Sequence, residues 1–92
     1  LNTNDVLDGG LGTDRLTAQL ANGVSVRPTV NNIEEIDLTV ANAGGAGADN
    51  ATLNALNIEA GGDGLTVIRN VQTAAGDGLS ITNLSAPVNL EL

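Results

Sequence analysis

The residues best suited to chemistry lie in a glycine-rich stretch near the start of the chain. Residues 9–17 read Gly-Gly-Leu-Gly-Thr-Asp-Arg-Leu-Thr, with three glycines before Asp14 and the aliphatic Leu16 after it. Glycine-rich turns present backbone carbonyl oxygens, and the Asp14 carboxylate adds a charged oxygen. Calcium binds about six to eight such oxygen atoms in flexible geometry. The stretch therefore predicts a calcium site with Asp14, Gly10 and Gly12 as ligands.

Two further aspartates follow less complete versions of this pattern. Asp5 precedes Asp14 by nine residues, and residues 3–8 match the second half of the glycine and aspartate pattern. Asp49 follows the Gly-Gly-Ala-Gly of residues 44–47, but a small alanine occupies the aliphatic position after it. We expect both as calcium ligands, and a simple glycine and aspartate turn without metal is the alternative.

Asp63 and Asp77 depart further from the pattern, because each stands one residue before the last glycine of its cluster. They are included among the candidate calcium ligands. The alternative is favoured at both positions: an aspartate side chain in a turn caps its own backbone through Asx-type hydrogen bonds and needs no metal.

The composition excludes most other chemistry. The 92 residues include no Cys, His, Met, Phe, Trp or Tyr, and the three basic residues are all Arg. The usual zinc, iron–sulfur and haem sites lack their ligands, and disulfides cannot form. Catalysis would have only carboxylates and a few serines to work with, and no aromatic ring to stack a sugar. We therefore expect no enzymatic activity.

Charge narrows the range of partners. Eleven acidic residues against three Arg give a formal net charge of −8. Nucleic acid and anionic membrane surfaces require basic patches, and the three arginines stand too far apart in the sequence to form one. No apolar stretch approaches the roughly 20 residues that span a bilayer, so no direct membrane insertion is expected. Glu34, Glu35 and Asp37 are expected on a solvated outer face.

Short alternations of apolar and polar residues surround the glycine clusters and must position them. A period of two predicts strands, and Val, Ile and Thr favour strand over helix. The likeliest helical piece is residues 14–21. The predicted strands cover residues 24–26, 36–40, 65–67, 79–81 and 88–92.

An internal repeat of 14 residues relates Asp49, Asp63 and Asp77. Alignment on these aspartates places aliphatic residues in shared columns, as expected when successive coils stack the same side chains. The sequence thus predicts an all-β, right-handed parallel β-solenoid (a β-helix or β-roll) of short strands with Gly-rich corners. A Greek-key sandwich of short strands is the alternative. Two of the columns are Ala51, Leu65 and Leu79, and Leu53, Val67 and Ile81.

Residues 4–16, Asn-Asp-Val-Leu-Asp-Gly-Gly-Leu-Gly-Thr-Asp-Arg-Leu, resemble the RTX (repeat-in-toxin) proteins, and the resemblance implies calcium binding in a parallel β-roll. The chain holds one complete nonapeptide and one partial one, so a site at Asp14 is expected to need ligands from the next solenoid coil or from polypeptide outside the given sequence. We divide the chain into an RTX-like segment, residues 1–22, and irregular β-solenoid coils, residues 23–92. Together they are expected to form one fragment of a larger protein, since Leu1 stands where an initiator Met would.

Residues 30–40, 56–67 and 76–81 resemble the aliphatic, Thr- and Asn-rich coils of bacterial surface-layer proteins and large adhesins exported by type I secretion. This resemblance implies a secreted, cell-surface structural module that is stabilised by calcium and takes part in lattice or scaffold assembly. Its expected partner is protein, either through self-assembly or in neighbouring parts of the parent chain. The alternative is an RTX-type accessory or adhesive module of a large secreted enzyme or adhesin.

Overall fold

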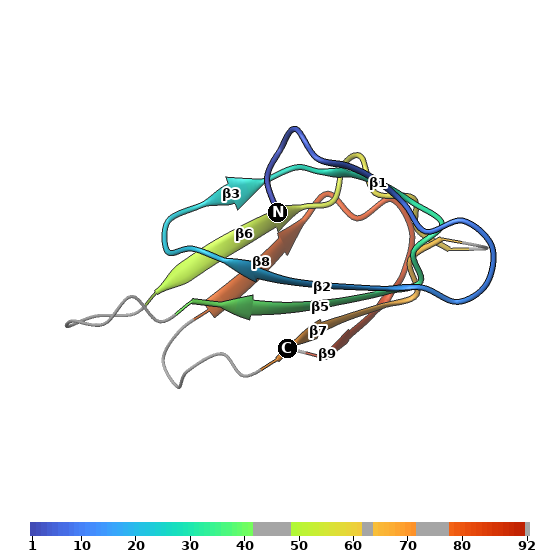
Figure 1. Cartoon of the computed structure of the whole chain (residues 1–92). Coiled ribbons are helices and arrows are strands. Elements are labelled where there is room, and N and C mark those ends of the chain that lie inside the picture. Colours follow the sequence, from blue (N-terminus) through green and yellow to red (C-terminus); the bar gives the residue numbers. More distant parts are fainter. Residues whose placement is uncertain (42–48, 62–63, 72–77, 92) are drawn as a thin grey trace.

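The computed structural model describes residues 1–41, 49–61, 64–71 and 78–91, and within them the chain is all-β (Figure 1). None of these residues forms a helix of the length and apolar character that crossing a membrane requires. The strands are short, and glycine- or asparagine-containing turns separate several of them. They are β1 Val6–Asp8, β2 Arg15–Leu20, β3 Ser25–Val26, β4 Thr29–Asn31, β5 Glu35–Val40, β6 Asn50–Asn54, β7 Val67–Asn70, β8 Gly78–Thr82 and β9 Asn89–Glu91.

The strands form three sheets, and every strand pair in the described residues is parallel. The sheet orders are β1-β4, β2-β5-β7-β9 and β3-β6-β8. Consecutive strands therefore enter different sheets, and the chain returns to the same sheet one turn later. A Greek-key sandwich is built from antiparallel strands, so that alternative is wrong for these residues.

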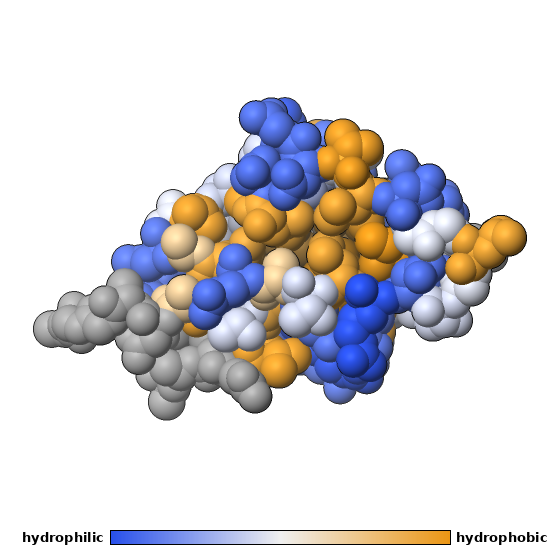
Figure 2. Space-filling view, in the orientation of Figure 1, coloured by the Kyte–Doolittle hydropathy of each residue, from blue (hydrophilic) through white to orange (hydrophobic). Residues whose placement is uncertain are grey.

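The register stacks aliphatic side chains of successive turns on one another. Because side chains alternate between the two faces of a strand, each row points to the interior and its polar neighbours point outward. Inner members such as Ile36, Ile68 and Leu53 are fully buried. Figure 2 shows hydrophobic side chains gathered in the centre of one face, with hydrophilic residues around them. The three rows are Leu16, Ile36, Ile68 and Leu90; Val26, Leu53 and Ile81; and Leu7, Val30 and Ile58.

Residues of the 14-residue repeat stack on residues two repeats away, and not on those of the next repeat. Strands β6 and β8 pair Ala51 with Leu79 and Leu53 with Ile81, which confirms these members of the predicted columns. The middle member Val67 instead begins β7 in the four-stranded sheet. Successive 14-residue repeats therefore alternate between two sheets, and every second repeat returns to the same one.

Residues 14–21, the nearest candidate for a helix in the sequence, form no helix, because β2 occupies Arg15–Leu20. The segment Arg-Leu-Thr-Ala-Gln-Leu alternates polar and apolar residues, and its side chains alternate between more exposed and less exposed positions. All six residues pair with β5, so tertiary pairing outweighs a local sequence that is compatible with either state. The strand predicted over residues 65–67 begins two residues later, because β7 covers Val67–Asn70 and Leu65 forms only an isolated bridge with Ala60.

Asparagine side chains connect neighbouring turns. The Oδ1 atom of Asn22 accepts from the backbone N–H of Asn50, and Oδ1 of Asn54 accepts from the side-chain amide of Asn83. Asn83 and Asn32 both adopt a positive φ, of 57° and 55°, a conformation that asparagine tolerates better than most residues. These residues turn the chain while satisfying backbone groups between strands.

The stacked rows predict that Ile36→Val lowers the free energy of unfolding by about 0.5–1.5 kcal/mol, because the lost methyl group leaves a small cavity. Urea unfolding monitored by circular dichroism measures the change. Leu11→Ala is the control, since the Leu11 side chain is fully exposed and its truncation should change stability by less than about 0.5 kcal/mol. Equal losses in the two variants would contradict this account of the core.

Candidate functional site

The glycine-rich loop between β1 and β2 forms one wall of a small pocket. Gly10, Leu11 and Gly12 line it together with Asn32 and Glu34, and its volume is about 190 Å³. Gly10 and Gly12 have φ values of 75° and 94°, a left-handed conformation that glycine adopts without steric cost. The pocket thus combines a glycine loop from one turn with polar residues that lie just before β5 in the next turn. We refer to residues 9–14, Asn32 and Glu34 as the glycine corner.

Gly9 fixes the approach of this loop to the next turn. Its backbone N–H donates to the carbonyl oxygen of Asn31 at 3.0 Å. A β-carbon at this position would collide with the Asn32 carbonyl oxygen and would lie 2.7 Å from Oδ2 of Asp14. Only glycine therefore allows the loop, Asn32 and Asp14 to lie so close together.

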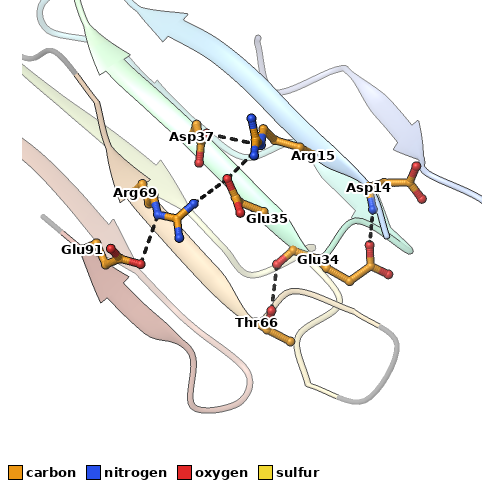
Figure 3. A network of polar contacts seen from close by, with 8 residues as sticks. All are labelled: Asp14, Arg15, Glu34, Glu35, Asp37, Thr66, Arg69 and Glu91. Carbon is orange, nitrogen blue, oxygen red and sulfur yellow. Dashed lines mark hydrogen bonds and ion pairs between the residues drawn. The ribbon is translucent and has the colours of Figure 1, made fainter. Parts of the chain in front are cut away.

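Asp14 links the loop to Glu34. Its backbone N–H donates to Oε2 of Glu34 at 2.6 Å, as Figure 3 shows, and its carbonyl oxygen accepts from the N–H groups of Glu34 and Glu35. Its carboxylate lies against Gly9, and the Oδ2 atom is buried without a hydrogen-bond partner in the described part of the chain. A buried carboxylate oxygen that lacks a donor is costly, and a bound cation would remove that cost.

Two other carboxylates, those of Asp8 and Glu59, lie beside the glycine corner. Asp8 accepts from the N–H of Gly10 and from the side-chain amide of Asn32, while Glu59 accepts from the N–H of Asn32. The hydrogen bond from Asn32, followed by that from Gly10, lowers the pKa of Asp8. No three carboxylates in the described residues are grouped closely enough to hold a metal by themselves, so a cation here would also need backbone or amide oxygens.

Of the predicted ligand set, Gly10 and Gly12 line the pocket, and Asp14 ends the same loop with its carboxylate against Gly9. Asp5 lies just before β1, where its carboxylate accepts from the N–H of Asn2, so it caps its own turn. Asp49 is buried beside the start of β6, and its carbonyl oxygen accepts from a glycine of β8. Asp63 and Asp77 lie outside the described residues.

Sequence reasoning missed two members of this corner, Asn32 and Glu34. Glu34 was expected on a solvated outer face, but it lines the pocket and accepts from the backbone of Asp14. The need for ligands from the next coil was foreseeable from the incomplete nonapeptide. Their identity was not, because it depends on the register between β2 and β5.

A second polar feature crosses the outward face of the four-stranded sheet (Figure 3). Arg15 of β2 contacts Glu35 of β5 at 2.9 Å and Asp37 at 3.6 Å. Arg69 of β7 contacts the same oxygen of Glu35 at 2.8 Å and Glu91 of β9 at 3.1 Å. Charges therefore alternate in sign from strand to strand. We refer to these five residues as the charge ladder.

The charge ladder corrects one prediction and adds a contact that the sequence did not indicate. Parallel stacking places Arg15 and Arg69 against one carboxylate. Glu35 and Asp37 were expected on a solvated face, but their side chains are only 16% and 13% exposed. The ladder compensates charges on the surface of the sheet, and it contains no pocket or nucleophile.

The pKa values of the two carboxyl groups on β5 are shifted in opposite directions. Burial raises the pKa of Asp37, and the neighbouring Glu35 raises it further through a hydrogen bond and its charge. Burial also acts to raise the pKa of Glu35, but a hydrogen bond with Asp37 and the charges of Arg15 and Arg69 outweigh it, so that pKa is lowered overall. The negative charge of Glu35 therefore stabilises the folded protein, whereas ionisation of Asp37 costs free energy in the folded protein.

These directions predict opposite effects of two neutralising substitutions. A lowered pKa means that the Glu35 carboxylate stabilises the fold at neutral pH and that this contribution is lost as the pH falls below its ordinary value of 4.5. A raised pKa means that Asp37 favours the fold when protonated and that this benefit is lost as the pH rises. At pH 7, Glu35→Gln should lower the melting temperature and Asp37→Asn should raise it, and both differences should shrink at low pH. Thermal melts with shifts of the same sign at pH 7 would contradict the assignment.

The close approach at the loop predicts that Gly9→Ala lowers the free energy of unfolding by about 1–3 kcal/mol, since backbone must shift to admit the methyl group. The matched control is Gly23→Asn. Gly23 has φ 80° with open space around its α-carbon, and asparagine tolerates that conformation. Chemical denaturation of both variants tests the claim, and a Gly9→Ala protein as stable as the parent would refute the geometry.

Comparison of the chain with protein-family models, with curated proteins and with solved structures gives no match to any of them. The functional assignment therefore depends on the residues of the glycine corner and of the charge ladder.

Proposed function

We propose that the chain is a calcium-stabilised structural module, folded as a right-handed parallel β-solenoid, of a secreted bacterial surface-layer protein. The observation that carries the proposal is the Oδ2 atom of Asp14, which lies against Gly9 of the glycine loop and is buried with no hydrogen-bond partner among the described residues. Glu34 of the next turn accepts from the backbone N–H of the same residue. An oxygen-rich corner with this uncompensated charge suits a hard cation.

The solenoid is supported by the way in which strands recur. Strands from successive turns join the same sheets in the same order, with parallel pairing throughout the described residues. Each turn also adds an aliphatic side chain to a continuing interior row, as in Leu16, Ile36 and Ile68. Such quasi-repeating turns bury their apolar face only against neighbouring turns. This repetitive arrangement supports the structural role that we propose.

The ligands proposed for calcium come from two turns. Asp14, Gly10 and Gly12 belong to the loop before β2, and Glu34 and Asn32 belong to the segment before β5. A divalent cation would offset the charges of Asp14 and Glu34 and hold the two turns together. Because the chain carries a net charge of −8, self-repulsion opposes compaction, and a cation bound only by the folded state favours folding by mass action.

The location and partners follow from the resemblance to surface-layer proteins. Calcium is abundant outside the cell, so a module that folds with calcium would stay loose during export and become rigid at the surface. Its partners would be protein: other copies, or neighbouring parts of the parent chain. We assign it no catalytic role, because neither the glycine corner nor the charge ladder presents a nucleophile beside a base.

The proposal predicts that calcium raises the melting temperature and that chelation lowers it. Calcium at about 100 times its dissociation constant should add about 2.7 kcal/mol to the free energy of unfolding. Differential scanning calorimetry in calcium, in magnesium and in a chelator measures the effect. Magnesium should stabilise less, since it demands a stricter octahedral geometry than this loop and carboxylate set provides.

Three substitutions test where calcium binds. Asp14→Asn and Glu34→Gln should each reduce the calcium-induced shift, whereas Asp37→Asn should preserve it. Asp37→Asn removes the same unit of charge from the charge ladder, away from the pocket-lining residues. Equal loss in all three variants would show general charge screening in place of a site. Melts that do not change with calcium in the parent protein would overturn the proposal.

A further inference from the structure

The four-stranded sheet ends on two strands of opposite character. β2 and β9 are its outer strands, and within the described residues neither has a neighbour on its outer side. An unpaired strand edge presents backbone donors and acceptors in a row, which favours pairing with another strand. What distinguishes these two edges is the side chains that they carry.

The charge ladder ends with a cation on one edge and an anion on the other. Arg15 stands on β2 and Glu91 on β9, and their side chains are 63% and 45% exposed, in contrast to 16% for the inner Glu35. Each terminal residue contacts an opposite charge on its inner side only. The alternation of sign would continue unbroken if an edge with Glu91 met an edge with Arg15.

The aliphatic row beneath the ladder ends in the same way. Leu16, Ile36, Ile68 and Leu90 share one row across the sheet. The inner pair is fully buried, Leu16 is half-buried and Leu90 is 42% exposed. Both edges therefore combine an incompletely covered aliphatic side chain with an adjacent charge, and those charges are complementary.

We propose that β9 of one copy pairs in parallel with β2 of a second copy, so that Leu90 packs beside Leu16 of the second copy and Glu91 lies diagonally across from Arg15 of the second copy. This inference rests on the parallel stack of the proposed function and names its partner surface. One copy already contains this diagonal relation between β5 and β7: Ile36 lies opposite Ile68, and Glu35, one residue before Ile36, contacts Arg69, one residue after Ile68.

The charges also select the direction of assembly. A symmetric contact through β2 would place Arg15 against Arg15 of the second copy, and one through β9 would oppose two Glu91 residues. Like charges across an interface are costly, so head-to-tail contact is favoured. A head-to-tail contact that does not close on itself produces open chains of copies. Linear, concentration-dependent assembly is the expected behaviour.

Charge reversal tests the contact. Arg15→Glu and Glu91→Arg should each weaken self-association by about tenfold or more, because each sets like charges against each other. An equimolar mixture of the two variants should regain association, since every mixed contact then joins opposite charges. Sedimentation velocity across a range of concentrations, with the parent protein alongside, measures both effects.

The matched control is Arg27→Glu, which makes the same charge change at an exposed residue between β3 and β4. It should associate as the parent does. Leu90→Asn provides a second variant that leaves the ion pair of Arg69 and Glu91 in place and should also weaken association. Circular dichroism identifies variants that fail to fold.

The proposed contact is overturned if the parent stays monomeric, if the single reversals associate as the parent does, or if the mixture does not recover. Calcium-dependent melting of the same samples separates this result from the proposed function. A parent protein that melts at a higher temperature with calcium but never associates would refute the contact alone. One that associates but does not respond to calcium would refute the calcium site alone.

Discussion

Parallel, in-register stacking of short strands is the constraint on which the rest of the structure depends. A strand of three to six residues, such as β1 or β5, buries too little surface to be stable by itself. It becomes stable when its aliphatic residues pack on those of the turns before and after it. Leu, Ile, Val and Ala are sufficient for this interior, because each position needs to fill only the narrow space between neighbouring turns.

The same register also determines how charge is arranged. Outward-facing side chains stack on those of neighbouring strands as strictly as inward-facing ones do, so unpaired like charges would accumulate in columns. On the four-stranded sheet the problem is met by alternation, with Arg15 and Arg69 on either side of the carboxylates of β5. At the glycine corner, Glu34 accepts from the backbone N–H of Asp14, and Oδ2 of Asp14 is buried without a hydrogen-bond partner among the described residues. In the charge ladder Oδ1 of Asp37 is buried in the same way, but Arg15 contacts the other oxygen of that carboxylate. The corner is therefore the proposed place for an external cation.

Much of the fold could be read from local pattern. Alternation with a period of two predicts the strands at β3, β5, β8 and β9, and the structure confirms an all-β chain with short parallel strands in several sheets. The 14-residue repeat predicts that Leu53 and Ile81 stack, which they do. The segment of β2 was not among the predicted strands, although its residues alternate in polarity with a period of two, so the local signal for this strand was present in the sequence.

The sequence by itself determined the strand-forming segments, the glycine loop with Asp14 and the excess of negative charge, because these depend on residue type and on spacing within a few positions. Only the tertiary structure decided that Glu34 meets Asp14 and that Arg15 and Arg69 share Glu35. Paired residues on neighbouring strands of the four-stranded sheet are 20, 32 and 22 positions apart, as in Arg15 with Glu35, Glu35 with Val67 and Val67 with Asn89. Because these turns differ in length, no single period in the sequence predicts the register of this sheet, and the packing of the whole stack sets it.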